Sequence, residues 1–487
     1  MKSGILSAGQ CHRLISCLNA FSSIQFSFRI IKGHVACGCA CTCANTSYSR
    51  SVYDNIMSRA AFRAATLILE KIERHGISLD RAFSEIISKV DFKENIIRTY
   101  NFAFNSLFYY RAADYLLSSE KIHAPLRRVC AFRVGFTLLI DKKLGFTFED
   151  LKRISGGLLT SKMFRILKKV SRLTFEDILE EIPGNQRLGV KYSIPDWLIV
   201  RLLKVMDRSS LENLLRSTMR SMTWIRINSL KENPTKILKK LSQVAVVRKD
   251  KDYDYMYEIL KGREQLIISS IVKNGYVIIH DKGSAVVVSA ISPEKYDNIL
   301  DMAAAPGIKT SIIAQLTDNT SRIIALDISH GRLSDMKNLL QLWNVLNVDL
   351  ILCDSTRICL SKYPRKIIID APCSNTGAIA SDPGLRLALN KRGFDPIKFQ
   401  KVQYSMLEKA IKDSRKNTTI VYSTCSLLPE EGELVIEKLL ANYDIEVDTS
   451  NVIGTSGYNT YRIARKVKRL FPHINKTTGF FIARIYR

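Results

Sequence analysis

The stretch Asn298-Ile-Leu-Asp301-Met-Ala-Ala-Ala-Pro-Gly307-Ile-Lys-Thr310 decides the fold. A short apolar run ends at an acid, a turn of small residues follows, and a helical pattern begins after the glycine. Small residues let the backbone of such a turn approach a ligand while the helix N-terminus points towards it. With only one glycine, the turn matches neither the dinucleotide-binding nor the phosphate-binding consensus. It predicts a strand, a ligand-binding turn and a helix.

Further apolar runs that end near a polar residue follow the same plan. We expect buried parallel strands at residues 298–301, 322–327, 349–354, 366–370 and 419–423, with helices between them. This alternation predicts a doubly wound α/β sheet, which binds ligands beyond the carboxyl ends of its strands. Asp327 and Asp354 close the second and third strands, where carboxylates can hold ribose hydroxyls and an adenine amine. Together with Asp301, these acidic strand ends favour a cofactor that carries adenosine.

Cysteines follow the next two strand ends. Asp370-Ala-Pro-Cys373-Ser comes after the fourth strand, and Tyr422-Ser-Thr-Cys425-Ser comes after the fifth. Taken singly, each thiol is better explained as a small buried hydrophobe, because free cysteine is commonly buried. Two cysteines in equivalent positions beside an acid are better explained as reactive groups at the ligand-binding edge of the sheet.

Before residue 191 the sequence is helical. Apolar residues three and four apart predict helices at residues 58–75, 79–90, 96–115, 127–140 and 162–170, which make an all-helical domain over 57–190. Seven lysines and arginines, with no acid among them, lie between residues 152 and 172. They form either a phosphate-facing surface or an ordinary solvated helix face.

Residues 191–290 have a mixed character. Strand patterns occur at residues 224–228, 244–247, 277–280 and 286–288. They predict a small α+β segment that precedes the α/β domain of residues 291–487.

The charge of the chain favours an anionic partner. Its 73 lysines and arginines exceed its 46 aspartates and glutamates, so the net charge is +27. Nucleic acid and an anionic membrane surface are the partners that such an excess favours. No uncharged apolar run reaches the ~18 residues that a membrane-spanning helix requires.

Residues 1–56 are expected to form a Cys-rich N-terminal extension that is poorly ordered or precedes the true start at Met57. The extension contains Cys11, Cys17, Cys37, Cys39, Cys41 and Cys43. Such uneven placement favours a reduced intracellular protein over one stabilised by disulfides. The one-residue spacing of the last four differs from that of structural zinc sites, so a soft-metal site is a weaker alternative, as is a signal peptide.

The motifs at residues 301–310, 370–374 and 422–431 follow one another along the chain. In this order they resemble the motifs of the Sun/Fmu-type, NusB-domain-containing RNA cytosine-carbon-5 methyltransferases. The resemblance covers nearly everything after residue 58. It includes Pro195-Asp-Trp197, Trp224-Ile-Arg-Ile-Asn228, His280-Asp-Lys-Gly-Ser284, Arg332, Gln403 and Gly479-Phe-Phe-Ile-Ala483. It implies a NusB-like RNA-binding domain at 57–190, a small RNA-recognition segment at 191–290, and a class I (Rossmann-like) methyltransferase domain at 291–487.

The resemblance also assigns the chemistry. A thiolate that adds to carbon 6 of cytosine makes carbon 5 nucleophilic towards a sulfonium methyl group. By the family pattern Cys425 is this nucleophile, Cys373 assists release of the methylated base, and Asp370 forms a hydrogen bond near ring nitrogen 3. The implied S-adenosyl-L-methionine contacts are Ala303, Ala304, Ala305, Pro306, Gly307, Ile308, Lys309, Asp327, Arg332, Asp354 and Asp370, and no metal is implied. The target base must leave its stack to reach the pocket.

Several positions depart from the family pattern. Ile308 stands where a second glycine is usual, and we expect it to crowd the cofactor turn and weaken cofactor binding. The other departures are Ala303, Asn375, Gly432 and the pair Ala380-Ser381. None of them removes a reacting group.

The resemblance leaves the substrate open. Ribosomal RNA is the expected partner, and transfer RNA is the alternative. The protein is expected to be a cytoplasmic monomer that has no membrane partner. The rival class is a non-catalytic RNA-binding factor for ribosome assembly. Among enzymes, a DNA cytosine methylase would use Cys373 as the nucleophile, whereas an amino-group methylase would require a Pro-Pro-aromatic motif after Asp370, which the sequence lacks.

Overall fold

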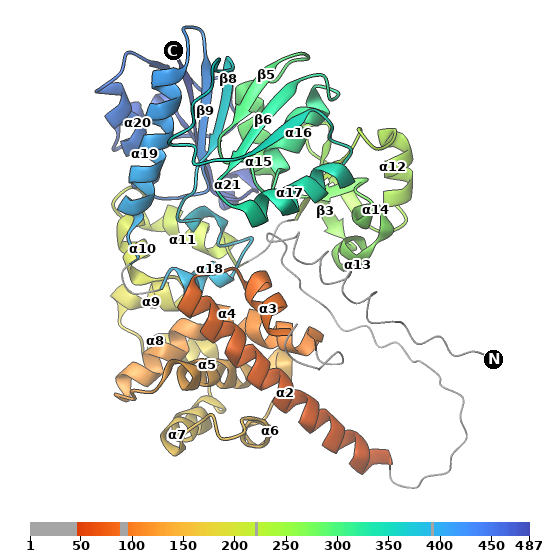
Figure 1. The fold of residues 1–487 in the computed structure, drawn as a ribbon. Helices are drawn as coiled ribbons and strands as arrows, with labels where there is room; N and C mark the ends of the chain where they lie inside the picture. The colour runs from red at the N-terminus through yellow and green to blue at the C-terminus, as the bar shows by residue number, and fades with distance from the viewer. Residues whose placement is uncertain (1–45, 88–95, 220–222, 391–393) are drawn as a thin grey trace, which may run out of the picture. The chain divides into compact units, whose positions relative to one another are not determined.

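The computed structural model describes residues 46–87, 96–219, 223–390 and 394–487. The N-terminal cysteines up to Cys43, and with them the soft-metal and signal-peptide hypotheses, lie outside the described residues. Within the described chain, a helical unit comprises residues 46–200 and 382–390, and an α/β unit comprises residues 201–381 and 394–487. Figure 1 labels the elements of both units.

Helices joined by short loops make up the helical unit. They are α2 (Thr46–His75), α3 (Leu79–Ile87), α4 (Ile96–Ser119), α5 (Leu126–Ile140), η2 (Lys142–Leu144), α6 (Phe148–Ile154), α7 (Ser161–Val170), α8 (Phe175–Glu180) and α9 (Gly184–Lys191), and the boundary between the units falls inside α10 (Asp196–Leu202). The hydroxyls of Thr147, Thr160 and Thr174 cap α6, α7 and α8 by accepting a backbone N–H three residues further on. The apolar faces of the helices share one core, which includes Leu107 and Phe136.

The predicted helices are confirmed, with different ends. α2 begins at Thr46 rather than at residue 58, and α4 continues to Ser119 rather than ending at residue 115. The last residues of the second predicted helix, 88–90, lie outside the described part of the chain. Periodicity locates a buried face, whereas caps and loops set where a helix ends, so boundaries are the less predictable feature.

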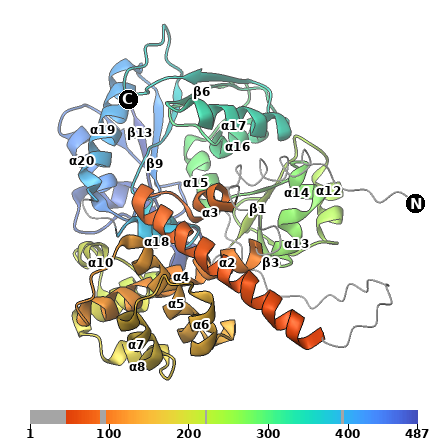
Figure 2. The same cartoon turned by 60° about the horizontal axis from the view of Figure 1, so that its bottom comes forward.

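Residues 382–390 belong to the helical unit although they follow the fourth strand of the α/β sheet. Their short helix α18 (Gly384–Ala388) packs against α2 and α4 (Figure 2). The buried Arg386 donates through Nη1 to the carbonyl of Tyr192 at 2.5 Å, and its own carbonyl accepts from the Tyr110 hydroxyl at 2.8 Å. The Asp382 carboxylate accepts from the Leu79 amide at 3.3 Å. The division therefore differs from the unbroken 291–487 domain expected from the sequence, because periodicity does not show which core a five-residue helix joins.

The α/β unit is built on one large mixed sheet. Its strands are β5 (Asn298–Asp301), β6 (Arg322–Asp327), β7 (Val348–Leu352), β8 (Lys366–Asp370), β9 (Thr419–Thr424), β10 (Glu446–Val447), β11 (Thr455–Ser456), β12 (Lys468–Leu470) and β13 (Phe480–Tyr486). They lie in the order β11-β12-β13-β9-β8-β5-β6-β7, with β10 paired to β13. The strands from β9 to β7 are parallel, and β13 joins them antiparallel. The predicted Rossmann-like sheet is confirmed, but β7 ends at Leu352, so Asp354 falls in the following loop.

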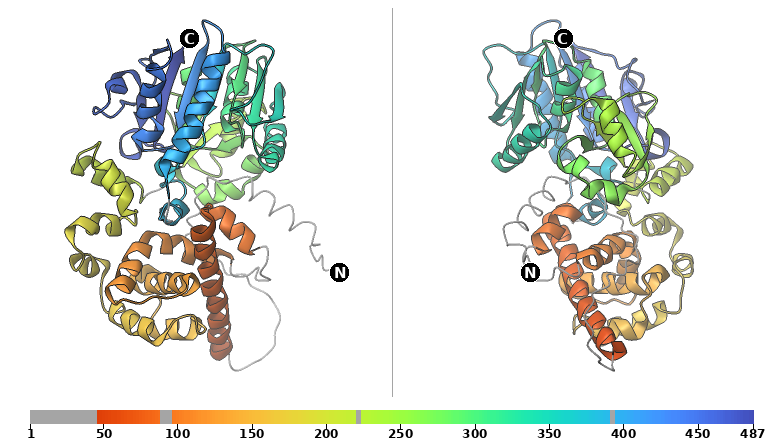
Figure 3. Two further views of the ribbon diagram at one scale, coloured as in Figure 1. Left: turned by 60° about the vertical axis from the view of Figure 1, so that its left-hand side comes forward. Right: turned by 90° about the vertical axis from the view of Figure 1, so that its right-hand side faces the viewer.

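Helices cover both faces of this sheet. On one face α15 (Lys282–Ile291), α16 (Ile308–Leu316) and α17 (His330–Leu342) share a core that includes Ile368. On the other face α19 (Pro396–Asp413) and α20 (Glu433–Leu440) share a core that includes Ile367 and Ile369. The left view of Figure 3 shows α19, in light blue, in front of the strands. Because alternate side chains of β8 are buried on opposite faces, the strand is apolar at every position between its two polar ends.

The strand predicted at residues 286–288 is wrong, since these residues lie inside α15. The Asp281 carboxylate caps this helix by accepting the Gly283 amide at 2.7 Å. Every residue from Lys282 to Val288 is buried, so the helix has no polar face that would reveal its period. A short run of valines does not distinguish a buried helix from a buried strand.

A second, antiparallel sheet lies earlier in the same unit. Its strands β1 (Trp224–Ile227), β2 (Val246–Lys249), β3 (Met256–Lys261) and β4 (Val277–Ile279) lie in the order β2-β3-β1-β4, with α12 (Pro234–Leu241), α13 (Arg263–Ile268) and α14 (Ser270–Lys273) between them. The α+β character of this segment is as predicted, whereas β3, whose alternation is broken by charged residues, is an additional strand. None of the helices in the described chain is both long and apolar enough to span a bilayer.

Candidate active site

The turn after β5 is held in place by its own acid. Asp301, only 1% exposed, accepts from the Thr310 hydroxyl at 2.8 Å, and burial raises the pKa of its carboxyl to about 6. Gly307 has φ +98°, and a Cβ there would come within 3.0 Å of Met336. The glycine is therefore required by the turn, and Asp301 supports the turn from inside the fold.

Asp327 and Arg332 meet the same turn at the end of β6. The Asp327 carboxylate, which is almost fully buried, accepts from the Ser329 amide at 2.9 Å and pairs with Nη1 of Arg332 at 3.2 Å. Nη2 of Arg332 donates to the carbonyl of Ala305. Three of the predicted cofactor residues are thus brought together at adjacent strand ends.

Asp354 is held separately in the loop that follows β7. Its carboxylate accepts from the Thr356 hydroxyl at 2.7 Å and from the Thr356 amide at 3.0 Å. These hydrogen bonds lower the pKa of Asp354. The carboxylate is half-buried and stays ionised at neutral pH, as a group that accepts from an amine must.

An ion pair links the first turn to the end of β8. Nζ of Lys309 lies 2.5 Å from Oδ2 of Asp370, and the other oxygen of Asp370 accepts from the Ser423 hydroxyl at 2.7 Å. Although burial opposes the charge of Lys309, the neighbouring Asp370 charge and hydrogen bond raise the pKa of the ammonium. Ser423 lies opposite Asp370 in the β8–β9 pairing, so the sheet register itself sets this contact.

The two predicted cysteines meet at the ends of β8 and β9. Their Sγ atoms are 3.1 Å apart, and Oδ1 of Asn375 lies 2.8 Å from Sγ of Cys425 and 3.5 Å from Sγ of Cys373. Cys373 is buried and Cys425 is half-buried. The hydrogen bond to Cys425, together with burial, raises the pKa of the Cys373 thiol. This environment favours Cys425 as the more accessible of the two thiols.

Glycines bring the two cysteine loops into backbone contact. The Gly377 amide donates to the carbonyl of Cys425 at 2.9 Å, and the Gly479 amide donates to the carbonyl of Gly377 at 3.0 Å. A Cβ on Gly377 would lie 2.1 Å from the Gly479 carbonyl oxygen. The crossing of these loops therefore excludes any side chain at residue 377.

Some departures from the family pattern have a local explanation. Asn375 adopts φ +57°, a left-handed conformation that asparagine tolerates better than most residues. A Cβ on Gly432 would lie 2.7 Å from the ring of Phe481 and 2.9 Å from Nη2 of Arg469, so an asparagine has no room there. Ile308 is half-buried and packs against the core of one sheet face. Its predicted effect on cofactor binding stays a prediction, and nothing in the structure explains the pair Ala380-Ser381.

The structure adds contacts for residues to which the sequence assigned no role. Ser423 and Asn375 contact Asp370 and the thiols, and Glu431 contacts the serines that follow each cysteine. Glu431 belongs to the quoted motif at residues 422–431, but the sequence does not show which glutamate of the pair Glu430-Glu431 is buried. A buried acid becomes evident only when its partners from a second loop are placed beside it.

Residues 288–486 match the family model described as 16S rRNA methyltransferase RsmB/F. The match contains both cysteine loops, the Lys309–Asp370 pair and the acids after β6 and β7. This part of the chain is similar to the RsmB/F family. The match agrees with the resemblance that the ordered motifs indicated.

Curated proteins similar to this chain include two named RNA methyltransferases. A human protein named 28S rRNA (cytosine(4447)-C(5))-methyltransferase is 29% identical over 323 residues, which are 61% of this chain and 38% of the relative. A Pyrococcus horikoshii protein named tRNA (cytosine(72)-C(5))-methyltransferase is 34% identical over 214 residues, which are 44% of this chain and 53% of the relative. The matched segments thus span between about two fifths and about half of these relatives.

A solved structure extends the likeness beyond the RsmB/F segment. The crystal structure of the protein PH0851 covers 88% of this chain and 99% of its own, with a TM-score of 0.72 and 22% sequence identity. At this identity the likeness concerns the fold alone.

Proposed function

We propose that the protein transfers a methyl group from S-adenosyl-L-methionine to carbon 5 of a cytosine in RNA. The observation that carries the proposal is the pair of thiols 3.1 Å apart, beside the Lys309–Asp370 ion pair, at the carboxyl ends of neighbouring parallel strands. The match to the RsmB/F family model and the printed names of both relatives support the same reaction class.

The residues at the turn after β5 fit the proposed cofactor. A carboxylate has about four lone-pair positions, and Asp327 uses one oxygen for Ser329 and the other for Arg332, which leaves acceptors for a ribose diol. Asp354 supplies an ionised acceptor for an adenine amine, and Gly307 gives the backbone a close approach. In this assignment Ala303, Ala304, Ala305, Pro306, Gly307, Ile308, Lys309, Asp327, Arg332, Asp354 and Asp370 hold the cofactor, which supplies an electrophilic methyl group when bound.

Cys425 is the proposed nucleophile. Its sulfur forms a bond to carbon 6 of the cytosine, and the electrons of the ring double bond become available at carbon 5. Ring nitrogen 3 takes up the proton that the Cys425 thiol loses and donates it in a hydrogen bond to Asp370, whose charge is balanced by Lys309. After methylation, loss of the proton from carbon 5 expels the Cys425 sulfur and restores the double bond, and the sulfur recovers the proton of ring nitrogen 3.

Cys373 is the proposed release group. A thiol whose pKa is raised keeps its proton near neutral pH, which makes Cys373 the poorer initial nucleophile. Once deprotonated, the same thiol is the stronger base and suits removal of a proton from carbon 5. The different environments of the two sulfurs therefore support different roles, as the family pattern assigns them.

The helical unit is proposed to be a NusB-like RNA-binding domain, and ribosomal RNA its substrate. The lysines and arginines between residues 152 and 172 are all exposed, which supports a phosphate-facing surface. The family description and the human relative name ribosomal RNA, while the Pyrococcus horikoshii relative keeps transfer RNA as the second candidate. We further propose a cytoplasmic location, which the free cysteines among the described residues support, and a monomeric state.

Bisulfite sequencing of RNA from a deletion strain tests this function. We expect one cytosine to lose its methyl group, and the identity of that RNA separates the two substrate candidates. If every methylated cytosine persists while ribosome assembly is impaired, the non-catalytic RNA-binding alternative replaces the enzyme.

Asp327→Ala is expected to weaken S-adenosyl-L-methionine binding by about 1–3 kcal/mol, because hydrogen-bond acceptors for the ribose are lost. Isothermal titration calorimetry of the purified protein measures the change. Asp349→Ala is the matched control, since Asp349 also pairs with an arginine, Arg322 at 2.8 Å, but at the amino end of the strands. Equal affinity of the Asp327 variant and the wild type would remove Asp327 from the cofactor site.

Replacing Arg165 and Lys168 by glutamine is expected to weaken binding of all RNAs alike and to reduce the salt slope by about 1–2. Both side chains are exposed on α7. The matched control replaces Lys409 and Lys412 by glutamine, because these lysines lie on α19, outside the 152–172 stretch, and are paired with acids at 2.7 and 3.3 Å. Filter binding at several salt concentrations measures both variants, and a loss confined to one RNA sequence would indicate base readout instead.

A further inference from the structure

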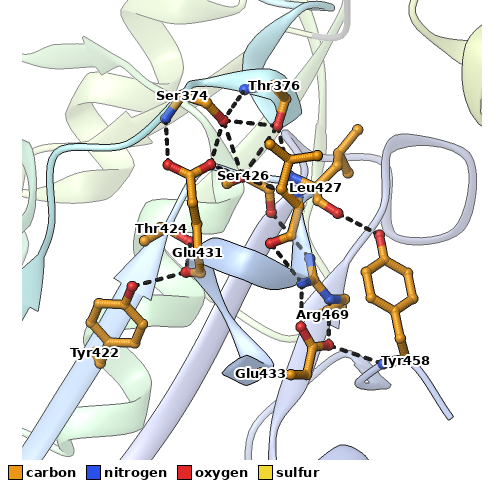
Figure 4. A network of polar contacts seen from close by, with 11 residues as sticks. Ser374, Thr376, Tyr422, Thr424, Ser426, Leu427, Glu431, Glu433, Tyr458 and Arg469 are labelled. Atoms are coloured by element: carbon orange, nitrogen blue, oxygen red, sulfur yellow. Dashed lines mark hydrogen bonds and ion pairs between the residues drawn. The ribbon is translucent and has the colours of Figure 1, made fainter. Parts of the chain in front are cut away.

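A buried carboxylate joins the two cysteine loops. Glu431 ends the short 3-10 turn η4 (Pro429–Glu431) after β9, and its side chain is 0% exposed. One carboxylate oxygen accepts from the Ser374 amide at 2.8 Å, and the other accepts from the hydroxyls of Ser374 and Ser426. Ser374 directly follows Cys373, and Ser426 directly follows Cys425. Figure 4 shows this convergence of both loops on one side chain.

The backbone of Glu431 is fixed to β9. Its carbonyl accepts from the Tyr422 hydroxyl at 2.8 Å and from the Thr424 hydroxyl at 3.1 Å. Glu431 is therefore anchored to β9, the strand that directly precedes Cys425, and its side chain reaches the loop that carries Cys373. The position of the Cys373 loop thus depends on the position of the end of β9.

Further hydrogen bonds tighten the same junction. The amide nitrogen of Gln403 donates to Glu431 at 3.2 Å and to the carbonyl of Pro372, next to Cys373, at 2.9 Å. The Thr376 hydroxyl accepts from the Leu427 amide at 2.9 Å. Both loops are thus tied through residues next to the cysteines rather than through the sulfur atoms.

The chemistry of the carboxylate indicates a role in geometry. Its hydrogen-bond partners are hydroxyls, a side-chain amide and a backbone N–H, and none of these carries a positive charge. Burial raises the pKa of Glu431, although the serine hydrogen bonds oppose that shift. A desolvated acid without a cation is costly, so an apolar residue would serve packing better.

We propose that Glu431 is a positioning residue that fixes the separation of the Cys373 and Cys425 thiols. The inference rests on the proposed function, because the separation matters for catalysis only if one cysteine attacks and the other assists release. Misplacement of a reacting group by about 1 Å is enough to lower a rate by about 10²-fold. Glu431 itself touches neither sulfur and acts through the serines that follow the cysteines.

The test measures thiol geometry without RNA or cofactor. Oxidised glutathione converts the two thiols to an intramolecular disulfide and is itself reduced to two molecules of glutathione, and peptide mass spectrometry follows the Cys373–Cys425 link over time. We expect Glu431→Ala to slow this link at least tenfold. Glu431→Gln, which keeps an accepting oxygen, is expected to remain within about threefold of the wild type.

Glu437→Gln is the matched control. Glu437 lies on α20, just beyond Glu431, and accepts a backbone amide, that of Ile463, at 3.2 Å, but it has no part in the cysteine loops. We expect this variant to form the disulfide at the wild-type rate. Should Glu431→Ala fail to fold, Ser426→Ala removes one of the two loop contacts and is expected to slow the link as well.

Methylation kinetics give a second readout. We expect Glu431→Ala to lower kcat by tenfold or more while KM for RNA and for S-adenosyl-L-methionine stays within twofold. Disulfide formation at the wild-type rate in folded Glu431→Ala and in Ser426→Ala would overturn the inference. If the link is slowed but the wild type methylates no RNA, the proposed function fails while the positioning role stands.

Discussion

Cys425→Ala is expected to lower RNA methylation by roughly 10⁴-fold or more and to form no covalent protein–RNA conjugate, because the sulfur that attacks carbon 6 is absent. Cys373→Ala should still attack and transfer the methyl group, and should then accumulate as a conjugate. A thioether to the base is not broken by unfolding, so denaturing gel electrophoresis with labelled RNA detects it.

The opposite pattern would reverse the assignment. A conjugate from Cys425→Ala and none from Cys373→Ala would make Cys373 the nucleophile, as in the DNA-methylase arrangement. Full activity of both variants would remove the covalent mechanism. With the sulfurs 3.1 Å apart, a single base can be reached from either thiol, so the experiment tests which of the two attacks carbon 6.

Asp370→Asn is expected to reduce the single-turnover rate by about 10²–10³-fold, the usual effect of removing a group that stabilises developing charge. The substitution also leaves the ammonium of Lys309, 11% exposed, without its counter-ion at 2.5 Å. Rapid-quench measurement of methyl transfer gives the rate, and the yield of trapped conjugate shows whether attack on carbon 6 is the affected step.

Asp297→Asn is the control for this prediction. Asp297 pairs with Lys366 at 2.7 Å and has similar burial, but this pair lies at the amino ends of β5 and β8. Both substitutions remove a lysine counter-ion from the same sheet, so their effects on thermal stability should be comparable. An equal loss of activity in both variants would show that Asp370 acts only by stabilising the fold.

The strands of the large sheet are predictable from sequence for a physical reason. A parallel strand covered on both faces is apolar at nearly every position, as Ile367, Ile368 and Ile369 are. Carboxyl ends of neighbouring parallel strands meet at one edge, so the amino-acid sequence alone places Asp327, Asp370 and the cysteines along that edge. Their individual roles stay predictions.

Other features depend on tertiary contacts that periodicity does not encode. The valines of α15 are buried on all sides, and therefore carry no amphipathic signal. The contact between Glu431 and Ser374 joins residues 57 positions apart in the chain. Asn375 reaches the thiols from a left-handed backbone position, which only the folded loop defines.

The inclusion of residues 382–390 in the helical unit bears on how such a gene can be cut and recombined. A fragment that stops at residue 200 lacks α18, and with it the hydrogen bonds that Arg386 makes to Tyr110 and Tyr192. The complementary fragment exposes Arg386 and Leu387, which are buried in the intact chain. A chimera that exchanges the helical unit between relatives must therefore exchange two separate segments of sequence together. Substitutions in either segment affect the same hydrophobic core, so the two segments evolve together.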